Sequence, residues 1–363
     1  MRIGVPKETK IEEHRVGLTP SSVGELTAAG HEVLVETGAG AANYFTDQAY
    51  KEAGAQLVNV EQAFSTDLVI KVKEPSLAEC ARLRPGQTLF TYLHLAAAPE
   101  QAKALMESGC TAIAYETVED SNGRLPLLTP MSEVAGRMSI QVGAAALQRS
   151  AGGRGVLLGG VPGVAPGKVV ILGGGMAGAN AAQMACGLLA DVTILDKSQD
   201  RLRELSGDFK GRARVLMASR ENVRNAVMAA DLVVGAVLVP GASAPRLIDY
   251  DLLRRMQPGS VLVDISIDQG GCFASSKPTT HTDPTYIEEG IVHYCVTNMP
   301  GGVARTSAEA LNNATLPYIK RLANVGVDKA LLADPGFEKG LNVHAGHVRH
   351  TAVAESLGLQ IAA

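Results

Sequence analysis

The sequence predicts an α/β fold of two domains, in which a doubly wound parallel sheet is inserted into a second α/β domain and a cleft lies between the two. Three observations indicate this fold. Residues 1–118 alternate β-rich runs with helical stretches, which is typical of a mostly parallel sheet. A glycine-rich turn that follows residue 172 belongs to a second alternation of the same kind. Residues 305–363 are too few to form a domain, so they have to pack onto an earlier part of the chain.

The first domain is expected over residues 1–127, where five apolar runs predict strands: RIGVP, HEVLVETG, DLVIKV, TLFTYLHL and TAIAYETV. Segments such as residues 20–29 separate these runs and predict helices. Residues 119–130 (EDSNGRLPLLTP) are rich in turn formers and predict a connection. Residues 131–150 then predict a helix, whose apolar positions at helical spacing are Val134, Met138, Val142 and Ala145.

The second domain is expected over residues 128–304. A glycine- and proline-rich stretch, residues 152–167, leads into an apolar strand, and the later runs VTILD, DLVVGAV and SVLVDIS predict further strands of the same sheet. Residues 306–323 predict a helix after this sheet. The economical arrangement returns residues 305–363 to the first domain, so that the second domain is an insertion.

The composition is typical of a soluble globular protein, because 46% of the 363 residues are hydrophobic and 19% are charged. The net charge of −4 leaves no basic excess, so neither nucleic acid nor an anionic membrane surface is expected as a partner. No apolar run approaches the ~18–20 residues that span a bilayer. The first residues, MRIGVPKETK, lack the pattern of a secretory signal, so a cytoplasmic location is expected.

Metal sites are not predicted. The five cysteines are scattered and none belongs to a C-x-x-C pair, which disfavours both a disulfide framework and a zinc site. In the tail, His344, His347 and His350 recur at intervals of three and could share one face of a helix. A solvated face is the simpler interpretation, because an ordinary zinc site needs a fuller set of ligands.

The run VVILGGGMAGANAA, residues 169–182, places a Gly-x-Gly-x-x-Gly turn between an apolar strand and a small-residue helix. Gly173 allows the tight turn, Gly175 lets the backbone approach a pyrophosphate, and Gly178 lets helix and strand pack closely. The N-terminus of the helix then offers its free N–H groups to the phosphates. A plain βαβ turn is the alternative, but the surrounding strand, helix and acid favour a Rossmann-type dinucleotide site.

The acid is Asp196, which ends the strand DVTILD 18 residues after the last glycine (196 − 178). This is close to the offset expected of the carboxylate that binds the ribose 2′-hydroxyl. A carboxylate there would repel the 2′-phosphate of NADP, so NAD is the expected cofactor. Lys197 and Arg201 are close by in the sequence and could weaken this preference.

Polar residues at the ends of other predicted strands are candidates for the chemistry, because ligands of open α/β sheets bind beyond the carboxyl ends of the strands. These candidates are Lys73 in DLVIKVK, His94 in TLFTYLHL, Asp268 after VLVDISI, and Asn298 at the end of HYCVTN. A lone histidine or lysine on such a strand is often only a satisfied or snorkelling side chain. It is the joint placement of these four residues and of the glycine turn after KVVIL that argues for a cleft.

Arg15 follows the first predicted strand, in the segment KETKIEEHRVGLTP. A guanidinium can hold a carboxylate through two parallel hydrogen bonds, which a lysine cannot match in geometry. Arg15 is therefore a candidate for binding a substrate carboxylate. The alternative is a solvated loop charge among charged neighbours, which are Lys7, Glu8, Lys10, Glu12 and Glu13.

Several long segments, in the same order along the chain, resemble the alanine dehydrogenase family, which also holds the NAD(H)-binding domain of proton-translocating transhydrogenase. GVPKETKIEEHRVGLTPSSVGELTAAGH resembles the first signature of this family, and GVAPGKVVILGGGMAGANAA resembles the second. KVKEP, LFTYLHLA, LTPMSEVAGRMSIQVGA, VDISIDQGG and TNMPG resemble segments that form the active site in this family. One departure is Glu12-Glu13, where the family commonly has Asn-Glu.

The resemblance implies roles for individual residues. Arg15 and Lys73 would hold the carboxylate and the carbonyl oxygen of the substrate. His94 and Asp268 would transfer protons. The residues implied to line the cleft near the nicotinamide are Asn298 and Met299. The residues implied to contact NAD are Ser132, Gly173, Gly175, Met176, Ala177, Gly178, Asp196, Lys197, Arg201, Ser219 and Leu238.

Taken as a whole, the resemblance implies a homohexamer that uses NAD to deaminate L-alanine oxidatively and reversibly, giving pyruvate and ammonia. Two related alternatives stay open, namely the soluble NAD(H)-binding subunit of a transhydrogenase and a saccharopine dehydrogenase that forms lysine. A non-catalytic NAD-binding module is a third alternative, because a fold does not by itself fix a function. The presence of Arg15, Lys73 and His94 together favours an enzyme that acts on a small acid.

Overall fold

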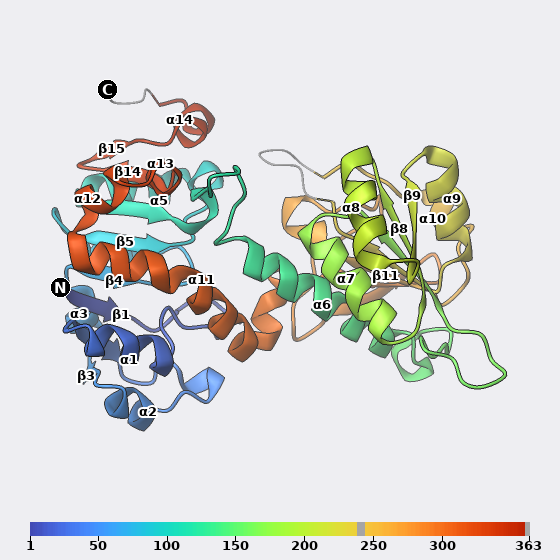
Figure 1. The fold of residues 1–363 in the computed structure, drawn as a ribbon, viewed down its shortest axis with the longest axis horizontal. Helices are drawn as coiled ribbons and strands as arrows, with labels where there is room; N and C mark the ends of the chain where they lie inside the picture. The colour runs from blue at the N-terminus through green and yellow to red at the C-terminus, as the bar shows by residue number, and fades with distance from the viewer. Residues whose placement is uncertain (238–243, 360–363) are drawn as a thin grey trace. The chain divides into compact units, whose positions relative to one another are not determined.

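The computed structural model describes residues 1–237 and 244–359, and the chain divides into two compact units (Figure 1). Unit 1 combines Met1–Met131 with the chain from Val303 onward, and unit 2 comprises Ser132–Gly302. Each unit is built around a mostly parallel sheet of its own. The predicted α/β class, with one sheet inserted between two segments that share the other, is confirmed.

Within the described residues, the sheet of unit 1 has eight strands in the order β15-β14-β6-β5-β4-β1-β2-β3. The strands from β6 to β3 are parallel, and β14 pairs antiparallel with β6 and β15. The C-terminal segment therefore extends a sheet that the N-terminal segment begins. The strands are β1 Arg2–Val5, β2 Glu32–Glu36, β3 Gln56–Val58, β4 Leu68–Ile70, β5 Thr88–Thr91, β6 Thr111–Ala114, β14 Leu341–His344 and β15 His347–Val348.

The central strands β4, β5 and β6 are buried along their whole length, because helices cover both faces of this sheet. One core cluster joins Ile3 and Leu68 to Leu311 and Ile319 of α11. A second cluster, on the other face, holds Leu105 of α5. The helices are α1 Pro20–Ala28, α2 Asp47–Glu52, α3 Val60–Phe64, α4 Leu77–Cys80, α5 Pro99–Ser108, α11 Ala304–Val325, α12 Val327–Leu332, α13 Pro335–Glu338 and α14 Thr351–Leu357, with 3-10 turns η1 Ala41–Asn43, η2 Leu95–Ala97 and η3 Tyr115–Thr117.

The described sheet of unit 2 has seven strands in the order β12-β13-β11-β10-β7-β8-β9, all parallel except β12. The chain order reverses at β7, which has β8 on one side and β10 on the other. Such a reversal leaves a crevice at the carboxyl ends of the strands where ligands bind in doubly wound folds. The strands are β7 Lys168–Leu172, β8 Asp191–Asp196, β9 Ala213–Met217, β10 Leu232–Gly235, β11 Val261–Asp264, β12 Thr285–Glu288 and β13 Ile291–Tyr294.

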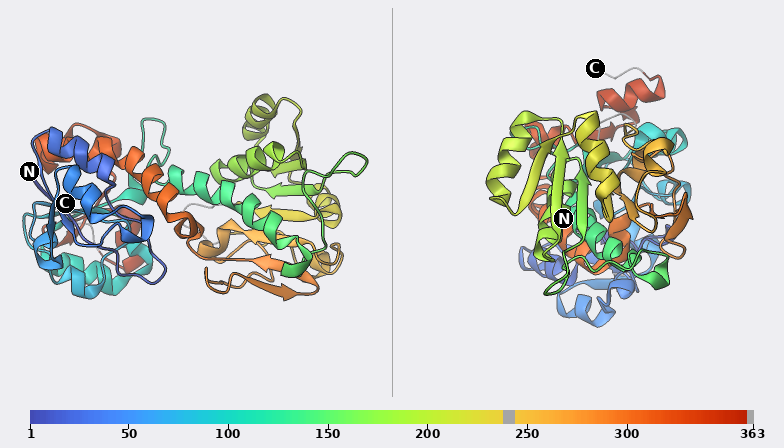
Figure 2. Two further views of the ribbon diagram at one scale, coloured as in Figure 1. Left: turned by 90° about the horizontal axis from the view of Figure 1, so that it is seen from below. Right: turned by 90° about the vertical axis from the view of Figure 1, so that its right-hand side faces the viewer.

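Helices lie on both sides of this second sheet, as the right-hand view of Figure 2 shows. One core cluster packs Ile140 of α6 and Ala181 of α7 on Ile171, and the other packs Val227 of α9 on Val233. Small residues at the start of α7 let it approach β7 closely. The helices are α6 Thr129–Ala146, α7 Met176–Gly187, α8 Gln199–Phe209, α9 Arg220–Ala229 and α10 Tyr250–Leu253, with 3-10 turns η4 Arg149–Ala151, η5 Ile265–Gln269 and η6 Met299–Val303.

Some elements end earlier than the sequence predicts. The run DLVIKV is a strand only to Ile70, and TLFTYLHL only to Thr91. In the tail, His344 ends β14 and His347 begins β15, while His350 precedes α14. The three histidines therefore do not share a helix face, because a tight hairpin separates the first two.

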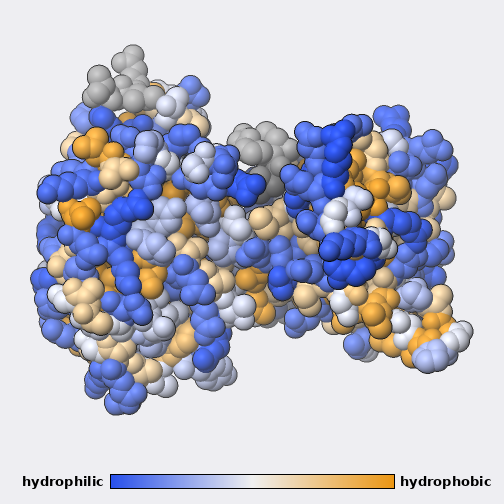
Figure 3. Space-filling model, viewed as in Figure 1, coloured by the Kyte–Doolittle hydropathy of each residue, from blue (hydrophilic) through white to orange (hydrophobic). Residues whose placement is uncertain are grey.

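The surface of both units carries polar side chains in the view of Figure 3, with smaller apolar areas between them. In unit 2 the exposed apolar side chains include Leu157, Val161 and Val164, which belong to the loop before β7. Among the described helices, none combines the length and apolar character needed to cross a membrane.

Candidate functional site

Arg15 lies in the loop between β1 and α1 and is buried, with 2% of its side chain exposed. Its Nε and Nη2 donate to the two carboxylate oxygens of Glu13 at 2.8 and 2.5 Å, and its Nη1 lies 3.0 Å from the sulfur of Met131. The backbone N–H of Arg15 also donates to Glu13, at 3.0 Å, so the chain turns tightly around this carboxylate. The alternative of a solvated loop charge is therefore wrong, because Arg15 is a buried and oriented guanidinium.

Glu13 is ionised beside Arg15. Burial alone would raise the pKa of this carboxyl, but the hydrogen bonds and charge of Arg15, together with the charge of Lys73, lower the pKa to about 2. A carboxylate that meets an arginine through two parallel hydrogen bonds fixes the plane of the guanidinium. Glu13 thus orients Arg15, and Lys73 lies within electrostatic reach of the pair.

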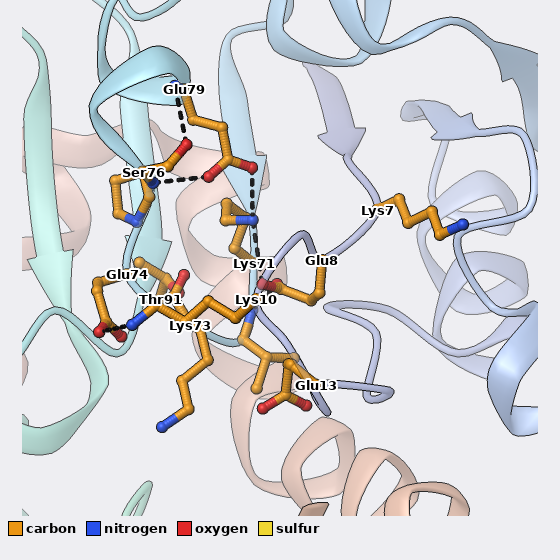
Figure 4. A network of polar contacts seen from close by, with 12 residues as sticks. Lys7, Glu8, Lys10, Glu13, Lys71, Lys73, Glu74, Ser76, Glu79 and Thr91 are labelled. Atoms are coloured by element: carbon orange, nitrogen blue, oxygen red, sulfur yellow. Dashed lines mark hydrogen bonds and ion pairs between the residues drawn. The ribbon is translucent and has the colours of Figure 1, made fainter.

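Lys73 lies in the segment that follows β4, three residues beyond the end of the strand. The hydroxyl of Thr91, at the end of β5, donates to the carbonyl oxygen of Lys73 at 3.0 Å. Figure 4 shows the side chain of Lys73 directed away from Lys71 and toward the side on which Glu13 lies. Lys71 is buried and paired with Glu8 and Glu79, whereas Lys73 is half-buried and does not belong to this group.

His94 follows β5 and has a left-handed backbone conformation, with a φ angle of 49°. Glu116 supports this conformation, because its carboxylate accepts the backbone N–H groups of Leu93 at 3.2 Å and of His94 at 2.6 Å. The imidazole stacks on the ring of Tyr92, and its Nδ1 lies 4.0 Å from Glu116 Oε1. Non-glycine residues with this backbone are uncommon and tend to cluster at functional sites. With 49% of its side chain exposed, His94 is accessible to a ligand or to water.

The three candidates of unit 1 lie at one edge of its sheet. Arg15 follows β1, Lys73 follows β4 and His94 follows β5, and these strands are parallel neighbours in the order β5-β4-β1. Their carboxyl ends therefore meet at the same edge, where ligands of open α/β sheets bind.

The glycine turn of unit 2 joins β7 to α7. Gly173 has a φ angle of 96°, which glycine adopts readily, and a Cβ at Gly178 would overlap the carbonyl oxygen of Gly173. Among the described residues, nothing lies within 4 Å of the position that a Cβ would take at Gly175. Backbone atoms therefore leave no room for a side chain at Gly173 and Gly178, whereas the space beside Gly175 is open. A phosphate can approach the backbone there.

Asp196, at the end of β8, lies against this turn and is partly exposed. Its Oδ2 accepts the backbone N–H of Gly174 at 2.7 Å, and its Oδ1 accepts that of Ser198 at 2.8 Å. Arg201 Nε donates to the carbonyl oxygen of Gly174 at 2.6 Å, and its Nη1 pairs with Glu204 at 2.6 Å. Arg201 therefore stabilises the turn through a backbone carbonyl, and Glu204 neutralises its charge. Lys197, which follows Asp196, is exposed.

The remaining cofactor candidates lie around this turn or apart from it. Met176 and Ala177 form the first turn of α7, and α6 touches α7 where a Cβ at Gly136 would overlap the carbonyl oxygen of Ala177. Ser132 is one turn earlier on the same face of α6. The hydroxyl of Ser219 accepts the backbone N–H of Asn222 at 3.1 Å and so caps α9. Leu238 lies outside the described residues.

Asp268 and Asn298 follow β11 and β13, which are parallel neighbours. Asp268 belongs to η5, and its Oδ2 lies 3.4 Å from the backbone nitrogen of Asn298, whose φ angle is 52°. Asp264 ends β11, directly before η5, and is fully buried. Its carboxylate accepts hydrogen bonds from the backbone N–H groups of Ser266 and Cys272 at 3.0 and 2.8 Å. Met299, which follows Asn298, is 3% exposed and belongs to a core cluster of unit 2.

The turn and its acid fit a dinucleotide. A main-chain cradle open at one glycine, the free N–H groups at the start of α7, and a carboxylate at the end of the next strand are the parts that hold a pyrophosphate and a ribose. A metal centre has no comparable support, because the described residues contain no group of three or more His, Cys, Asp or Glu side chains that could bind one ion. Each of the five cysteines is a free thiol.

The alternative of a solvated loop placed Glu8 and Glu13 in solvent, and Lys71 and Glu79 were not among the candidates. All four are buried. One signal was present, because Lys71 interrupts the apolar run DLVIKV and a lysine at such a position needs a buried counter-charge. The carboxylates that supply this charge come from other segments, so no local spacing reveals them.

Comparison with known proteins identifies related sequences along the whole chain. Residues 4–135 match the family described as alanine dehydrogenase/PNT, N-terminal domain, and residues 139–351 match its C-terminal domain. An alanine dehydrogenase of Halomonas elongata is 55% identical over 362 residues, which cover 99% of this chain and 98% of the relative. An alanine dehydrogenase of Mycobacterium tuberculosis is 53% identical over 361 residues, covering 99% and 97%.

Solved structures show the same relationship. A structure of L-alanine dehydrogenase superposes with a TM-score of 0.96 at 55% identity and covers 99% of each chain. A transhydrogenase from Sinorhizobium meliloti has a TM-score of 0.84 at 24% identity, over 97% of this chain and 100% of the other, and shares the fold alone. The chain belongs to the alanine dehydrogenase/PNT family.

Proposed function

We propose that this protein is an NAD-dependent amino-acid dehydrogenase that converts L-alanine to pyruvate and ammonia, reversibly and by hydride transfer from Cα. The observation that carries the proposal is the placement of a buried guanidinium, a lysine and a half-exposed imidazole at the carboxyl edge of one sheet. Alanine is the proposed substrate because relatives 53–55% identical over almost the whole chain are named alanine dehydrogenases.

The substrate acid would be held by two cations. Arg15, whose plane is fixed by Glu13, would receive the substrate carboxylate, and an anion bound in this way sets which face of Cα is presented for reaction. Lys73 would contact the carbonyl oxygen of pyruvate in the reverse direction. Its positive charge withdraws electrons from the carbonyl carbon, which makes attack by ammonia easier.

Proton transfer would fall to His94 and Asp268. The amine of alanine has to lose a proton before Cα can release a hydride, and the water that attacks the resulting iminium has to lose protons as well. Imidazole is suited to both steps near neutral pH, and that of His94 is half exposed. The carboxylate of Asp268 would share this transfer and stabilise positive charge on the substrate as the iminium forms.

The cofactor would be held by unit 2. When bound, NAD supplies the acceptor for the hydride that leaves Cα. Gly173, Gly175 and Gly178 would cradle the pyrophosphate together with the start of α7, and Asp196 would accept hydrogen bonds from the adenosine ribose. Further cofactor contacts are proposed for Ser132, Met176, Ala177, Lys197, Arg201, Ser219 and Leu238, and contacts near the nicotinamide for Asn298 and Met299.

We further propose a substrate domain formed by residues 1–127 and 305–363, an NAD-binding domain formed by residues 128–304, and a homohexamer in the cytoplasm. The domain assignment follows the positions of the two sets of candidates in the sequence. The hexamer is supported by the family resemblance, and the cytoplasmic location stays a prediction.

The proposal is tested by following NADH absorbance. L-alanine with NAD should produce NADH, and pyruvate with ammonia and NADH should consume it. Lysine with 2-oxoglutarate and NADH is the control for a saccharopine dehydrogenase and should give little change. NADH binding without turnover in either direction would contradict the proposal and favour a transhydrogenase subunit or a non-catalytic module.

A further inference from the structure

A buried cluster of three charged side chains lies next to Lys73 in unit 1 (Figure 4). Lys71 Nζ lies 3.1 Å from Glu8 Oε2 and 3.0 Å from Glu79 Oε1. The exposed fractions of the three side chains are 1%, 2% and 7%. A buried ion pair is weak evidence for stability, because well-packed apolar side chains often stabilise as well or better. Two carboxylates around one ammonium therefore call for a reason other than stability.

The cluster fixes the backbone on both sides of Lys73. Glu8 uses Oε2 for Lys71 and Oε1 for the backbone N–H of Val72, which donates at 2.6 Å. Glu79 uses Oε1 for Lys71 and Oε2 for the backbone N–H of Ser76, at 2.7 Å. Each carboxylate thus joins the ammonium to one amide, and these two amides flank Lys73 in the chain.

A third contact acts on Lys73 itself, whose carbonyl oxygen accepts the hydroxyl of Thr91 at 3.0 Å. The segment from Val72 to Ser76 is therefore held by contacts from β5, from α4 and from the loop after β1, and Lys10 of that loop also pairs with Glu74. The side chain of Lys73 is left on the outer side of the cluster, toward Glu13, as Figure 4 shows.

The loop that supplies Glu8 is the loop that carries Arg15, since both lie between β1 and α1. Glu8 therefore connects the backbone of this loop to the residue that precedes Lys73. Burial by itself would lower the pKa of the Arg15 guanidinium, but the hydrogen bonds and charge of Glu13, with a smaller contribution from the charge of Glu8, raise it above the ordinary value. The carboxylate of Glu8 thus links the loop that carries Arg15 to the segment that carries Lys73.

We propose that Glu8, Lys71 and Glu79 are positioning residues that set the distance between Arg15 and Lys73, and so match this pair of cations to the carboxylate and the adjacent oxygen of a short 2-oxo acid. The inference rests on the proposed function, because it concerns the same substrate. A displacement of about 1 Å in a group that positions a substrate can lower the rate about 100-fold. The cluster prevents displacements of this size by holding the backbones of the segments that carry Arg15 and Lys73.

The test is Glu8→Gln, compared with Glu25→Gln in steady-state kinetics of pyruvate reduction at saturating ammonia and NADH. Glutamine keeps an oxygen for the N–H of Val72 but loses the charge that pairs with Lys71. The control removes an ion pair of the same unit in which Glu25 and Lys320 lie 2.6 Å apart and are 57% and 35% exposed. Both variants are first checked for folding by circular dichroism, and for NADH affinity by fluorescence.

For Glu8→Gln we expect a rise in the KM for pyruvate of about tenfold or more, a smaller fall in kcat, and an unchanged Kd for NADH, which is proposed to bind unit 2. Glu25→Gln should leave all three constants as in the wild type. A purely structural role would lower the thermal midpoint of Glu8→Gln while its KM at 25 °C stayed the same, and that result would overturn the inference.

Glu79→Gln provides a second test if Glu8→Gln does not fold, because it weakens the same cluster from the side of α4. Its KM for pyruvate should rise as well, and an unchanged KM in this folded variant would refute the positioning role. A wild-type protein that does not act on pyruvate would overturn the proposed function first. An active wild type with an unresponsive cluster would overturn this inference alone.

Discussion

The candidate residues of the two units are held in place by different means. In unit 1, Arg15 contacts the buried carboxylate of Glu13, and the buried cluster of Glu8, Lys71 and Glu79 holds the backbone on both sides of Lys73. In unit 2, the glycine turn is held mainly by backbone contacts, and its acid, Asp196, is partly exposed. A small acid offers few atoms, so its binding depends on aimed side chains. A dinucleotide is large and can be recognised through the main chain, so its binding depends on shape.

This difference predicts that side-chain substitutions affect unit 1 most, whereas added volume at a glycine affects unit 2 most. The largest effect is expected for His94→Ala, because loss of a positioned proton-transfer group typically lowers kcat about 10²–10⁴-fold. Turnover of alanine and pyruvate is the measurement, with NADH affinity expected to be unchanged. His347→Ala, at an exposed histidine of β15, is the matched control. Near-normal turnover in His94→Ala would remove this residue from the chemistry.

Gly178→Ala is the corresponding test in unit 2. The new Cβ would overlap the carbonyl oxygen of Gly173, so the turn has to shift, and overpacking of this kind costs about 1–3 kcal/mol. We expect the Kd for NADH to rise about tenfold or more. The control is Gly187→Ala at the other end of α7, where no described atom lies within 4 Å of the added Cβ. Equal NADH affinity in the two variants would show that the shape of the turn does not limit binding.

Arg15→Lys keeps the charge but removes the planar fork. We expect the KM for pyruvate to rise about tenfold, because a hydrogen bond to a charged group contributes about 1.5–3 kcal/mol and lysine forms only a point contact. Arg2→Lys, at an arginine of the same unit whose side chain is 46% exposed, should change nothing. If Arg15→Lys binds pyruvate as the wild type does, the substrate carboxylate is held elsewhere.

Asp196→Ala tests the single acid of the glycine turn. We expect the preference for NAD over NADP to fall several-fold, since the carboxylate that repels a 2′-phosphate is gone. The ratio of kcat/KM for the two cofactors measures this preference. Asp200→Ala, at an exposed position of α8, is the control. An unchanged ratio would mean that Asp196 supports only the backbone of Gly174.

The smallest effect concerns acid stability. The pKa of Glu13 is lowered to about 2 in the folded protein, against about 4.3 for a free glutamate, so its ionised form stabilises the fold at neutral pH. This contribution is complete above about pH 5 and shrinks as the pH falls toward 2. The free energy of unfolding of the wild type, measured in urea relative to Glu13→Gln, should therefore fall by about 1 kcal/mol between pH 5 and pH 3.3. A constant difference would place the pKa of Glu13 near its ordinary value.

Local patterns predicted unit 2 better than unit 1. The glycine turn and Asp196 belong to one βαβ unit, so their spacing, together with the strands and the helix between them, predicts that they lie side by side. The burial of Arg15 depends on Glu13 and on Met131, which is more than a hundred residues away, and no local pattern records that contact. Lys71, which follows β4, likewise meets a carboxylate from a distant segment, Glu8.

The tail histidines show a second kind of failure. On a helix a spacing of three would let these histidines share a face, but Ala345 and Gly346 both have positive φ angles, of 47° and 83°, and form a two-residue hairpin between β14 and β15. Turns of this type usually contain asparagine, aspartate or glycine at both positions. Because alanine is uncommon in such turns, the sequence does not predict this hairpin. The antiparallel pairing of β14 with β6 stabilises the extended conformation.

The division of unit 1 between the two ends of the chain has a consequence for biosynthesis. Asn312 of α11 donates to the carbonyl oxygen of Gly17 at 3.2 Å, and β14 supplies the outer neighbour of β6. The first segment therefore leaves the ribosome with its sheet and core incomplete, and it waits through the translation of the whole of unit 2 for its partners. Unit 2 is continuous and meets no such delay. The proposed cofactor-binding unit can thus fold first. Until the last segment of the chain is translated, β6 is an unpaired edge strand of unit 1, and such edges are prone to aggregation.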